Sequence, residues 1–282
     1  MAECHVCFRH CGIEEGKLGF CGGRIARDGR VEAYNYGRVT SLALDPIEKK
    51  PLARFFPGSR ILSVGSFGCN LRCPFCQNHD ISWSEQAKRL ARTAETLSPE
   101  TLVELALATR DRGNIGLAFT YNEPLIGYEF ARDAARLARA EGLRNVMVTN
   151  GTAEPAVLEE LKPWIDAMNV DLKGFTDAYY SRVLGGSRSQ VMGFIEGAVE
   201  GCHVELTTLI VPGENDSEEE MRELSRWVSG LKNPDGTGVP LHISRFFPRF
   251  HMLDRKATEV RTVYRLAEVA RENLEYVYTG NC

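Results

Sequence analysis

The chain has 282 residues and a formal net charge of −4, and 43% of its residues are hydrophobic. The weak negative charge argues against a nucleic-acid or anionic-membrane partner, and no apolar run approaches the ~20 residues of a membrane-spanning helix. The segment Met1–His5 lacks the basic and apolar regions of a signal peptide. We therefore expect a cytoplasmic protein, long enough for one large α/β domain.

Cysteines are concentrated near the start, with seven of the nine before residue 77. This clustering indicates metal ligation, because disulfide frameworks belong to small secreted domains. The first four, in a glycine-rich segment with too little apolar surface to fold alone, are Cys4, Cys7, Cys11 and Cys21. They can form a closed zinc site, which the Cys4-x2-Cys7 turn slightly favours, or hold every iron of an auxiliary 4Fe–4S cluster. We expect a structural role, because a closed site offers substrate no position.

Residues 24–34 predict a β-hairpin, because Asp28-Gly29 lies between alternating apolar residues. A loop with three prolines follows, and we expect its run Glu48-Lys49-Lys50 to be exposed to solvent. The sequence thus divides into a cysteine-rich segment with a hairpin, 1–58, and a larger domain, 59–282.

A second cysteine group follows a predicted strand at 60–66, with Cys69, Cys73 and Cys76 at a C-x3-C-x2-C spacing. Three thiolates can hold three irons of a 4Fe–4S cluster and leave the fourth iron open for chemistry, and no further cysteine follows within the next hundred residues. The alternative is half of a zinc ribbon. Zinc ribbons prefer paired C-x2-C units, and only Cys73 and Cys76 form such a pair.

Strands and helices alternate after this loop. We expect strands at 115–120, 145–149, 167–172, 204–211, 239–245 and 275–278, and helices from Ser98, at 124–142, 154–163, 176–183 and 188–201, from Ser217, and at 257–273. Six β–α units with buried strands predict a parallel sheet with right-handed crossovers. The expected fold is α/β, a partial (β/α)6 TIM-like barrel with the N-terminal metal-binding extension. Its active site should lie at the carboxyl ends of the strands.

The Cys69–Cys76 spacing, with Phe75 as the aromatic residue, resembles the radical S-adenosylmethionine (SAM) signature C-x3-C-x-aromatic-C. The segments 149–151, 171–173 and 211–216 resemble the branch of the pyruvate formate-lyase activating enzymes. Within that branch the chain is most similar to the AmmeMemoRadiSam radical SAM proteins, through the cysteines before residue 22 and the segments 45–52 and 118–124. The resemblance covers essentially the whole chain and implies a SAM-cleaving enzyme. The auxiliary cysteines of activases, when present, follow the radical motif, whereas these four precede it.

Polar residues at the predicted strand ends offer partners for SAM. Glu123 can bind the methionine ammonium, Lys173 can bind its carboxylate, and Asn122 offers both donors and an acceptor. His251 follows the sixth strand and is a candidate for the adenosine side, whereas His242 lies within that strand and is expected to be packed. The full set expected to contact SAM is Phe75, Asn122, Glu123, Asn150, Asp171, Lys173 and His251.

The resemblance implies an oxidoreductase with no catalytic residue beyond the cluster ligands. Flavodoxin or ferredoxin would reduce the cluster, and SAM would split into methionine and a 5′-deoxyadenosyl radical that abstracts hydrogen from a substrate. A protein glycine, a peptide side chain and a small molecule all remain open as substrates. The alternatives are a non-catalytic iron–sulfur electron carrier and a zinc-dependent binding module.

Overall fold

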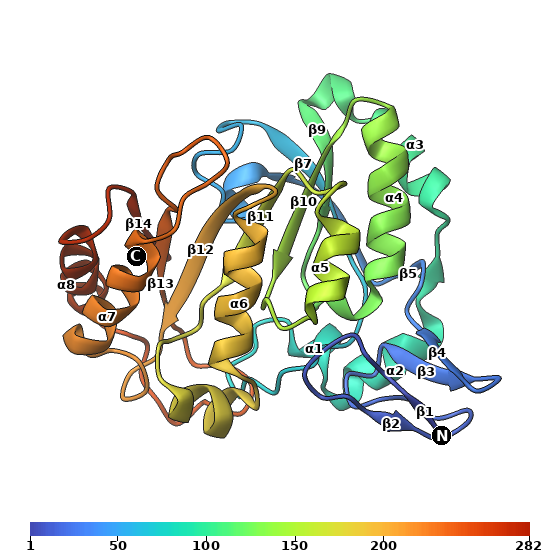
Figure 1. Cartoon of the computed structure of the whole chain (residues 1–282), viewed down its shortest axis with the longest axis horizontal. Helices are drawn as coiled ribbons and strands as arrows, with labels where there is room; N and C mark the ends of the chain where they lie inside the picture. The colour runs from blue at the N-terminus through green and yellow to red at the C-terminus, as the bar shows by residue number, and fades with distance from the viewer.

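The computed structural model describes residues 1–282, and its centre is one eight-stranded sheet in the order β14-β13-β12-β11-β10-β9-β7-β6 (Figure 1). The strands are β6 (Ser41–Pro46), β7 (Arg60–Gly65), β9 (Asn114–Phe119), β10 (Arg144–Thr149), β11 (Ala167–Asp171), β12 (His203–Ile210), β13 (Leu241–Arg245) and β14 (Val277–Gly280). All neighbours pair in parallel except β6, which is antiparallel to β7 at one edge. This is the α/β fold with a mostly parallel sheet that the sequence predicts.

Helices connect the parallel strands and cover the outer face of the sheet (Figure 1). They are α3 (Pro99–Leu107), α4 (Tyr128–Ala140), α5 (Pro155–Leu161), α6 (Arg188–Ala198), α7 (Glu218–Ser229) and α8 (Val260–Arg271), with short 3-10 turns at 47–49, 110–112 and 124–127 and a π-helical turn at 179–184. The predicted caps are confirmed, because Ser98 accepts from the N–H of Thr101 and Ser217 accepts from that of Glu220. None of the helices has the length and apolar character needed to cross a membrane.

The N-terminal region forms small antiparallel pairs beside this sheet. They are β1 (Ala2–Glu3) with β2 (Gly12–Ile13), β3 (Arg24–Arg27) with β4 (Arg30–Ala33), and β5 (Arg38–Val39) with β8 (Glu95–Thr96). The β3–β4 pair is the predicted hairpin. Two helices that the sequence analysis did not identify, α1 (His79–Ser82) and α2 (Glu85–Thr93), follow the second cysteine group.

Strand β6 was also missed. It lies in the predicted segment 1–58, yet it is hydrogen-bonded along its whole length to β7 of the main sheet. Its side chains alternate little between buried and exposed, and it ends at Pro46, which is tolerated because an edge strand leaves one row of backbone groups unpaired. Both features weaken the sequence signal of a strand.

The loop after β6 closes one end of the barrel. Ile47 and Leu52 are fully buried against residues near the amino ends of the strands, including Ile61 and Ala167. The loop then reaches β12, where the N–H groups of Ala53 and Arg54 donate to the Glu205 carboxylate at 3.0 and 2.8 Å. A segment that begins next to β7 therefore crosses to the far side of the curved sheet.

The expectation that Glu48-Lys49-Lys50 is exposed to solvent is wrong for Lys50. This side chain is only 2% exposed, and its Nζ lies 2.8 Å from Oδ2 of Asp45. The Tyr121 hydroxyl donates to the same oxygen at 2.6 Å. Burial of the lysine is tolerated because its charge is paired with a carboxylate that is itself hydrogen-bonded.

Candidate active site

The carboxyl ends of the strands surround a cavity of about 670 Å³, within the range of small-molecule sites. All three cysteines of the second group line it. The remaining lining comes from the ends of β9, β10 and β11 and the loops after them, from positions within β12, β13 and β14, and from the loop after β6. It includes Tyr121, Asn122, Glu123, Asn150, Asp171, Lys173, Thr207, His242, Ser244 and Tyr278. The prediction that the polar strand ends and the cysteine loop converge therefore agrees with the geometry.

The cysteine loop is fixed by backbone contacts on both sides. The N–H of Arg72 donates to the carbonyl of Leu184 at 2.9 Å, and that of Cys76 donates to Cys73 at 3.2 Å. Gly68 precedes the loop with φ of 93°, and a Cβ there would lie 2.7 Å from the carbonyl oxygen of Cys21. Only glycine therefore lets the N-terminal segment approach the loop this closely.

The three thiols are poised to bind metal and poorly suited to act as nucleophiles. Burial raises the pKa of Cys73 to about 11, and burial also raises the pKa values of Cys69 and Cys76. Reactive cysteines show lowered pKa values instead, whereas a bound metal ion displaces the thiol proton outright. Three thiols on one loop, one buried and two half-buried, all line the cavity and fit a 4Fe–4S cluster held by three cysteines.

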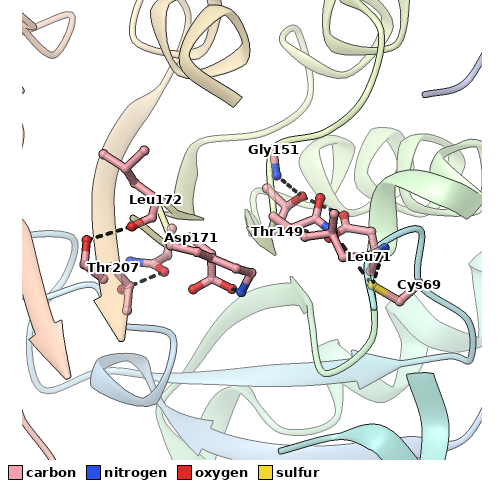
Figure 2. Close-up of polar contacts among 12 residues, drawn as sticks. Cys69, Leu71, Thr149, Gly151, Asp171, Leu172 and Thr207 are labelled. Carbon is pink, nitrogen blue, oxygen red and sulfur yellow. Dashed lines mark hydrogen bonds and ion pairs between the residues drawn. The ribbon is translucent and has the colours of Figure 1, made fainter. Parts of the chain in front are cut away.

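Donors to sulfur support this assignment. The N–H of Leu71 lies 3.4 Å from Sγ of Cys69, and Nδ2 of Asn150 lies 3.7 Å from it (Figure 2). Hydrogen bonds of this kind stabilise negative charge on ligating sulfur. Phe75, between the second and third cysteines, is buried and meets Phe246 edge-on with ring centroids 6.2 Å apart.

Glu123 joins the ends of two strands. Its Oε1 accepts from the N–H of Leu125 at 3.0 Å and from the Thr149 hydroxyl at 2.6 Å, and its Oε2 accepts from the N–H of Asn150 at 2.8 Å. Burial raises its pKa to about 7 despite these donors. Since a carboxylate offers about four acceptor positions, one remains for a ligand.

Asn122 and Asn150 are also bonded within the protein. Oδ1 of Asn122 accepts from the N–H of Ser66 at 2.9 Å, and its Nδ2 donates to Phe67 at 3.1 Å. Nδ2 of Asn150 donates to Oδ1 of Asn70 at 3.0 Å. Both asparagines line the cavity, and their hydrogen bonds hold the segments on either side of Cys69.

Asp171 and Lys173 supply charge to the cavity. Lys173 Nζ lies 2.8 Å from Oδ2 of Asp171 (Figure 2). Burial opposes the charged lysine, but Asp171 and the Cys73 thiol outweigh it and hold the pKa of Lys173 well above its usual value. The Lys173 carbonyl accepts from Nδ2 of Asn215 at 2.7 Å, so the recognised segment 211–216 positions this lysine.

His251 and His242 lie in different places. His251 is exposed, lies outside the cavity lining and rests against Phe250, and its N–H donates to the Pro74 carbonyl at 2.8 Å. His242 is packed as predicted, with Nε2 2.6 Å from Oε2 of Glu205, and it is also among the residues that line the cavity.

Sequence reasoning missed Tyr121 as a site residue. It lines the cavity with a positive φ of 74°, a strained conformation for an aromatic residue. A Cβ on Gly65 would lie 2.7 Å from its ring, so the glycine makes room for it. One sequence signal could have pointed to Tyr121. Segments 45–52 and 118–124 both resemble the AmmeMemoRadiSam proteins, and in the structure the two segments meet where the Tyr121 hydroxyl donates to Asp45.

The first cysteine group forms a separate, smaller cavity. Cys4, Cys7, Cys11 and Cys21 all line it, together with Arg9, Arg24 and apolar side chains. All nine cysteines are free thiols, so no disulfide competes with metal ligation. The structure therefore brings together the four residues that the sequence groups as one site.

Comparison with known proteins identifies the class. Residues 63–225 match the family model described as "Radical SAM superfamily", and the chain belongs to this superfamily. Membership implies a 4Fe–4S cluster and SAM, which the three thiols and the charged cavity fit.

The chain is also similar to individual proteins. The chain is 40% identical over 282 residues, covering 99% of it and 81% of the relative, to "Uncharacterized protein MJ0808" of Methanocaldococcus jannaschii. It is 29% identical to the pyruvate formate-lyase-activating enzyme of Clostridium pasteurianum, over 63% of this chain and 72% of that enzyme. In fold it resembles Streptococcus suis SuiB bound to S-adenosylmethionine, with a TM-score of 0.58 at 14% identity over 79% of this chain and 52% of SuiB.

Proposed function

We propose that this radical SAM enzyme binds SAM in the 670 Å³ cavity and abstracts hydrogen from a substrate there. Cys69, Cys73 and Cys76 would hold the 4Fe–4S cluster, which supplies the electron that splits SAM into methionine and the 5′-deoxyadenosyl group. The single observation that carries the proposal is that these thiols and the charged strand ends line one cavity.

The chain's own groups would bind and orient the methionine end of SAM. Lys173 offers N–H donors to the methionine carboxylate of SAM. Asp171, 2.8 Å from Nζ of Lys173, holds the lysine ammonium in place. The remaining acceptor position of Glu123 suits the methionine ammonium. Asn122, Asn150 and Phe75 would shape the pocket around these charges, and His251 would contact the adenosine side only if the 249–252 turn moved.

We propose flavodoxin or ferredoxin as the reductant, in the cytoplasm, and a protein as the substrate. The support for a protein substrate is similarity to activating enzymes, one of which is named for pyruvate formate-lyase. The proposed placement in the AmmeMemoRadiSam branch rests on the segments that meet at Asp45 and Tyr121. A simple electron carrier would have no use for a large charged cavity beside its ligands.

The test is spectroscopic. Reconstituted, reduced protein should give a 4Fe–4S EPR signal that changes when SAM is added, because SAM would bind in the cavity that these three thiols line. Cys73→Ala should lose this SAM-sensitive signal, while Cys202→Ala should keep it, because Cys202 is buried and does not line the cavity. A SAM-insensitive signal in the native protein would contradict the proposal.

A further inference from the structure

We propose that Cys4, Cys7, Cys11 and Cys21 hold a second 4Fe–4S cluster, and that this cluster is electronically coupled to the cluster of Cys69, Cys73 and Cys76. The proposal of a second cluster rests only on the N-terminal cavity and the four cysteines that line it. The proposal of coupling rests on the proposed function, because it needs a cluster at the second cysteine group.

The spacing of the sulfurs distinguishes a cluster from a single ion. In a tetrahedral zinc site, Zn–S bonds of ~2.3 Å place the sulfurs about 3.8 Å apart. Throughout the chain, the one group of three or more His, Cys, Asp or Glu ligand atoms within 4.8 Å of one another is Glu3, His5 and His10. The four cysteines share a cavity, and no three of their sulfurs lie within 4.8 Å of one another, so they are less closely grouped than a single zinc ion requires. This favours iron over the zinc that the turn spacing suggested.

The cavity also contains an unpaired donor. Arg24 is 5% exposed and lines the cavity, and its Nε has no hydrogen-bond partner. Its Nη1 is bonded to Glu129 at 2.6 Å, which fixes the guanidinium. A buried donor without a partner is costly unless a ligand accepts from it. An anionic site formed by four thiolates would supply the missing acceptor.

A second cation connects the two cysteine groups. Arg9 also lines the N-terminal cavity, and its Nε donates to the Asn70 carbonyl at 2.7 Å. Asn70 follows Cys69 directly, so this guanidinium lies between the two sets of thiols. A cation in this position stabilises negative charge at both sites.

The two sites are joined ligand to ligand. The N–H of Cys69 donates to the carbonyl of Cys21 at 3.1 Å. A second route runs through side chains, because Asn150 contacts Sγ of Cys69 at 3.7 Å and bonds to Asn70 at 3.0 Å, and the Asn70 carbonyl accepts from Arg9, which lines the N-terminal cavity. One electron, delivered by a one-electron protein carrier or dithionite, can pass along such contacts without forming or breaking a bond.

Coordination favours this electronic role over a substrate site. Four cysteines occupy every iron of a cubane, so no position remains for SAM or substrate. The small cavity lies beside the cysteine loop and is lined by none of the charged strand-end residues.

The first experiment removes the second cysteine group. The full chain carrying Cys69→Ala, Cys73→Ala and Cys76→Ala is purified anaerobically and analysed for iron, sulfide and zinc. We expect about 4 iron and about 4 sulfide per chain with no zinc, and a reduced EPR signal that does not respond to SAM. About 1 zinc without iron, or no metal, would overturn the proposal.

Metal analysis of the unmodified protein guards against misfolding of the variant. We expect about 8 iron without zinc, and about 4 iron with 1 zinc would refute the second cluster. If the proposed function failed instead, the triple variant would contain as much iron as the unmodified protein. The two failures are therefore distinguishable.

The second experiment tests the coupling. The EPR spectrum of the fully reduced, unmodified protein is compared with the sum of the spectra from the triple variant and from a Cys7→Ser, Cys21→Ser variant. We expect extra broadening from spin–spin interaction, because one hydrogen bond separates Cys21 from Cys69. A spectrum equal to the simple sum would refute the electronic coupling.

Discussion

The Tyr121 hydroxyl donates a hydrogen bond of 2.6 Å to Oδ2 of Asp45, the oxygen that also pairs with Lys50 Nζ at 2.8 Å. This contact ties the end of β6 to the loop after β9 and holds a strained tyrosine at the cavity wall. Burial would raise the pKa of Asp45, but Lys50 and Tyr121 outweigh burial and lower it to about 2. The carboxylate is therefore charged at neutral pH.

This network predicts a ranked loss of stability. Tyr121→Phe removes one charge-assisted hydrogen bond and should cost ~1.5–3 kcal/mol. Lys50→Met removes the buried cation of this carboxylate, leaves only the exposed Lys49 at 3.4 Å, and should cost ~3–5 kcal/mol. Denaturant unfolding measures both, with Tyr128→Phe as control, because its hydroxyl bonds to the more exposed Glu160 at 3.2 Å. Equal losses in Tyr121→Phe and Tyr128→Phe would contradict the network.

Lys173 should determine SAM affinity. Lys173→Met removes a charge-assisted contact worth ~1.5–3 kcal/mol, so SAM should bind roughly tenfold to a hundredfold more weakly while the iron content stays unchanged. Equilibrium dialysis with labelled SAM provides the measurement. Lys162→Met is the matched control, because that lysine pairs with the exposed Glu159 outside the cavity. Unchanged SAM binding in Lys173→Met would show that the methionine end lies elsewhere.

Glu205 should make the fold sensitive to acid. Burial would raise its pKa, but His203, His242 and the N–H groups of Ala53 and Arg54 lower it from 4.5 to about 2. A lowered carboxyl pKa stabilises the folded state above the unfolded-state pKa, and this stabilisation is lost as pH falls through the folded-state pKa. The shift corresponds to about 3 kcal/mol.

Glu205→Gln should therefore cost about 3 kcal/mol at pH 7, and its deficit relative to the unmodified protein should shrink as the pH falls from 4.5 toward 2. Denaturant unfolding across this range tests the sign. Glu200→Gln serves as control, because its side chain is 72% exposed. A deficit that is independent of pH would rule out charge at Glu205 as the cause.

Much of the fold was readable because the signals are local. Buried apolar runs located the parallel strands, and Ser98 and Ser217 identified two helix starts through contacts three residues away. Strand β6 was missed because half of its pattern faces solvent. The burial of Lys50 was missed because it depends on Tyr121, which meets Asp45 only in the folded chain.

The sequence predicted most of the residues that line the candidate site, but it did not predict their hydrogen-bond partners. Glu123 was recognised as a strand-end carboxylate, yet its partners Thr149 and Asn150 lie 26 and 27 residues away. Such partners depend on which strands become neighbours, which no local pattern gives. His251 was expected near SAM, but its turn packs against Pro74 and leaves the ring outside the cavity.

Arg24 should tune the N-terminal site. In the triple variant, Arg24→Leu removes a cation from the cavity and should lower the reduction potential by on the order of 50 mV, the equivalent of about 1 kcal/mol. Arg27→Leu is the control on the same strand, because this arginine is exposed and pairs with Glu32. Potentiometric EPR titration measures the reduction potential of each variant. Equal potentials in Arg24→Leu and Arg27→Leu would show that Arg24 does not act on the N-terminal site.

Formation of 5′-deoxyadenosine tests the central claim most directly. Anaerobic, reconstituted and reduced protein is incubated with SAM, and 5′-deoxyadenosine and methionine are quantified by liquid chromatography. We predict both products from the unmodified protein and from Cys202→Ala, and none above background from Cys69→Ala, Cys73→Ala or Cys76→Ala. Product formation by any of these three variants at the rate of the unmodified protein would contradict the account.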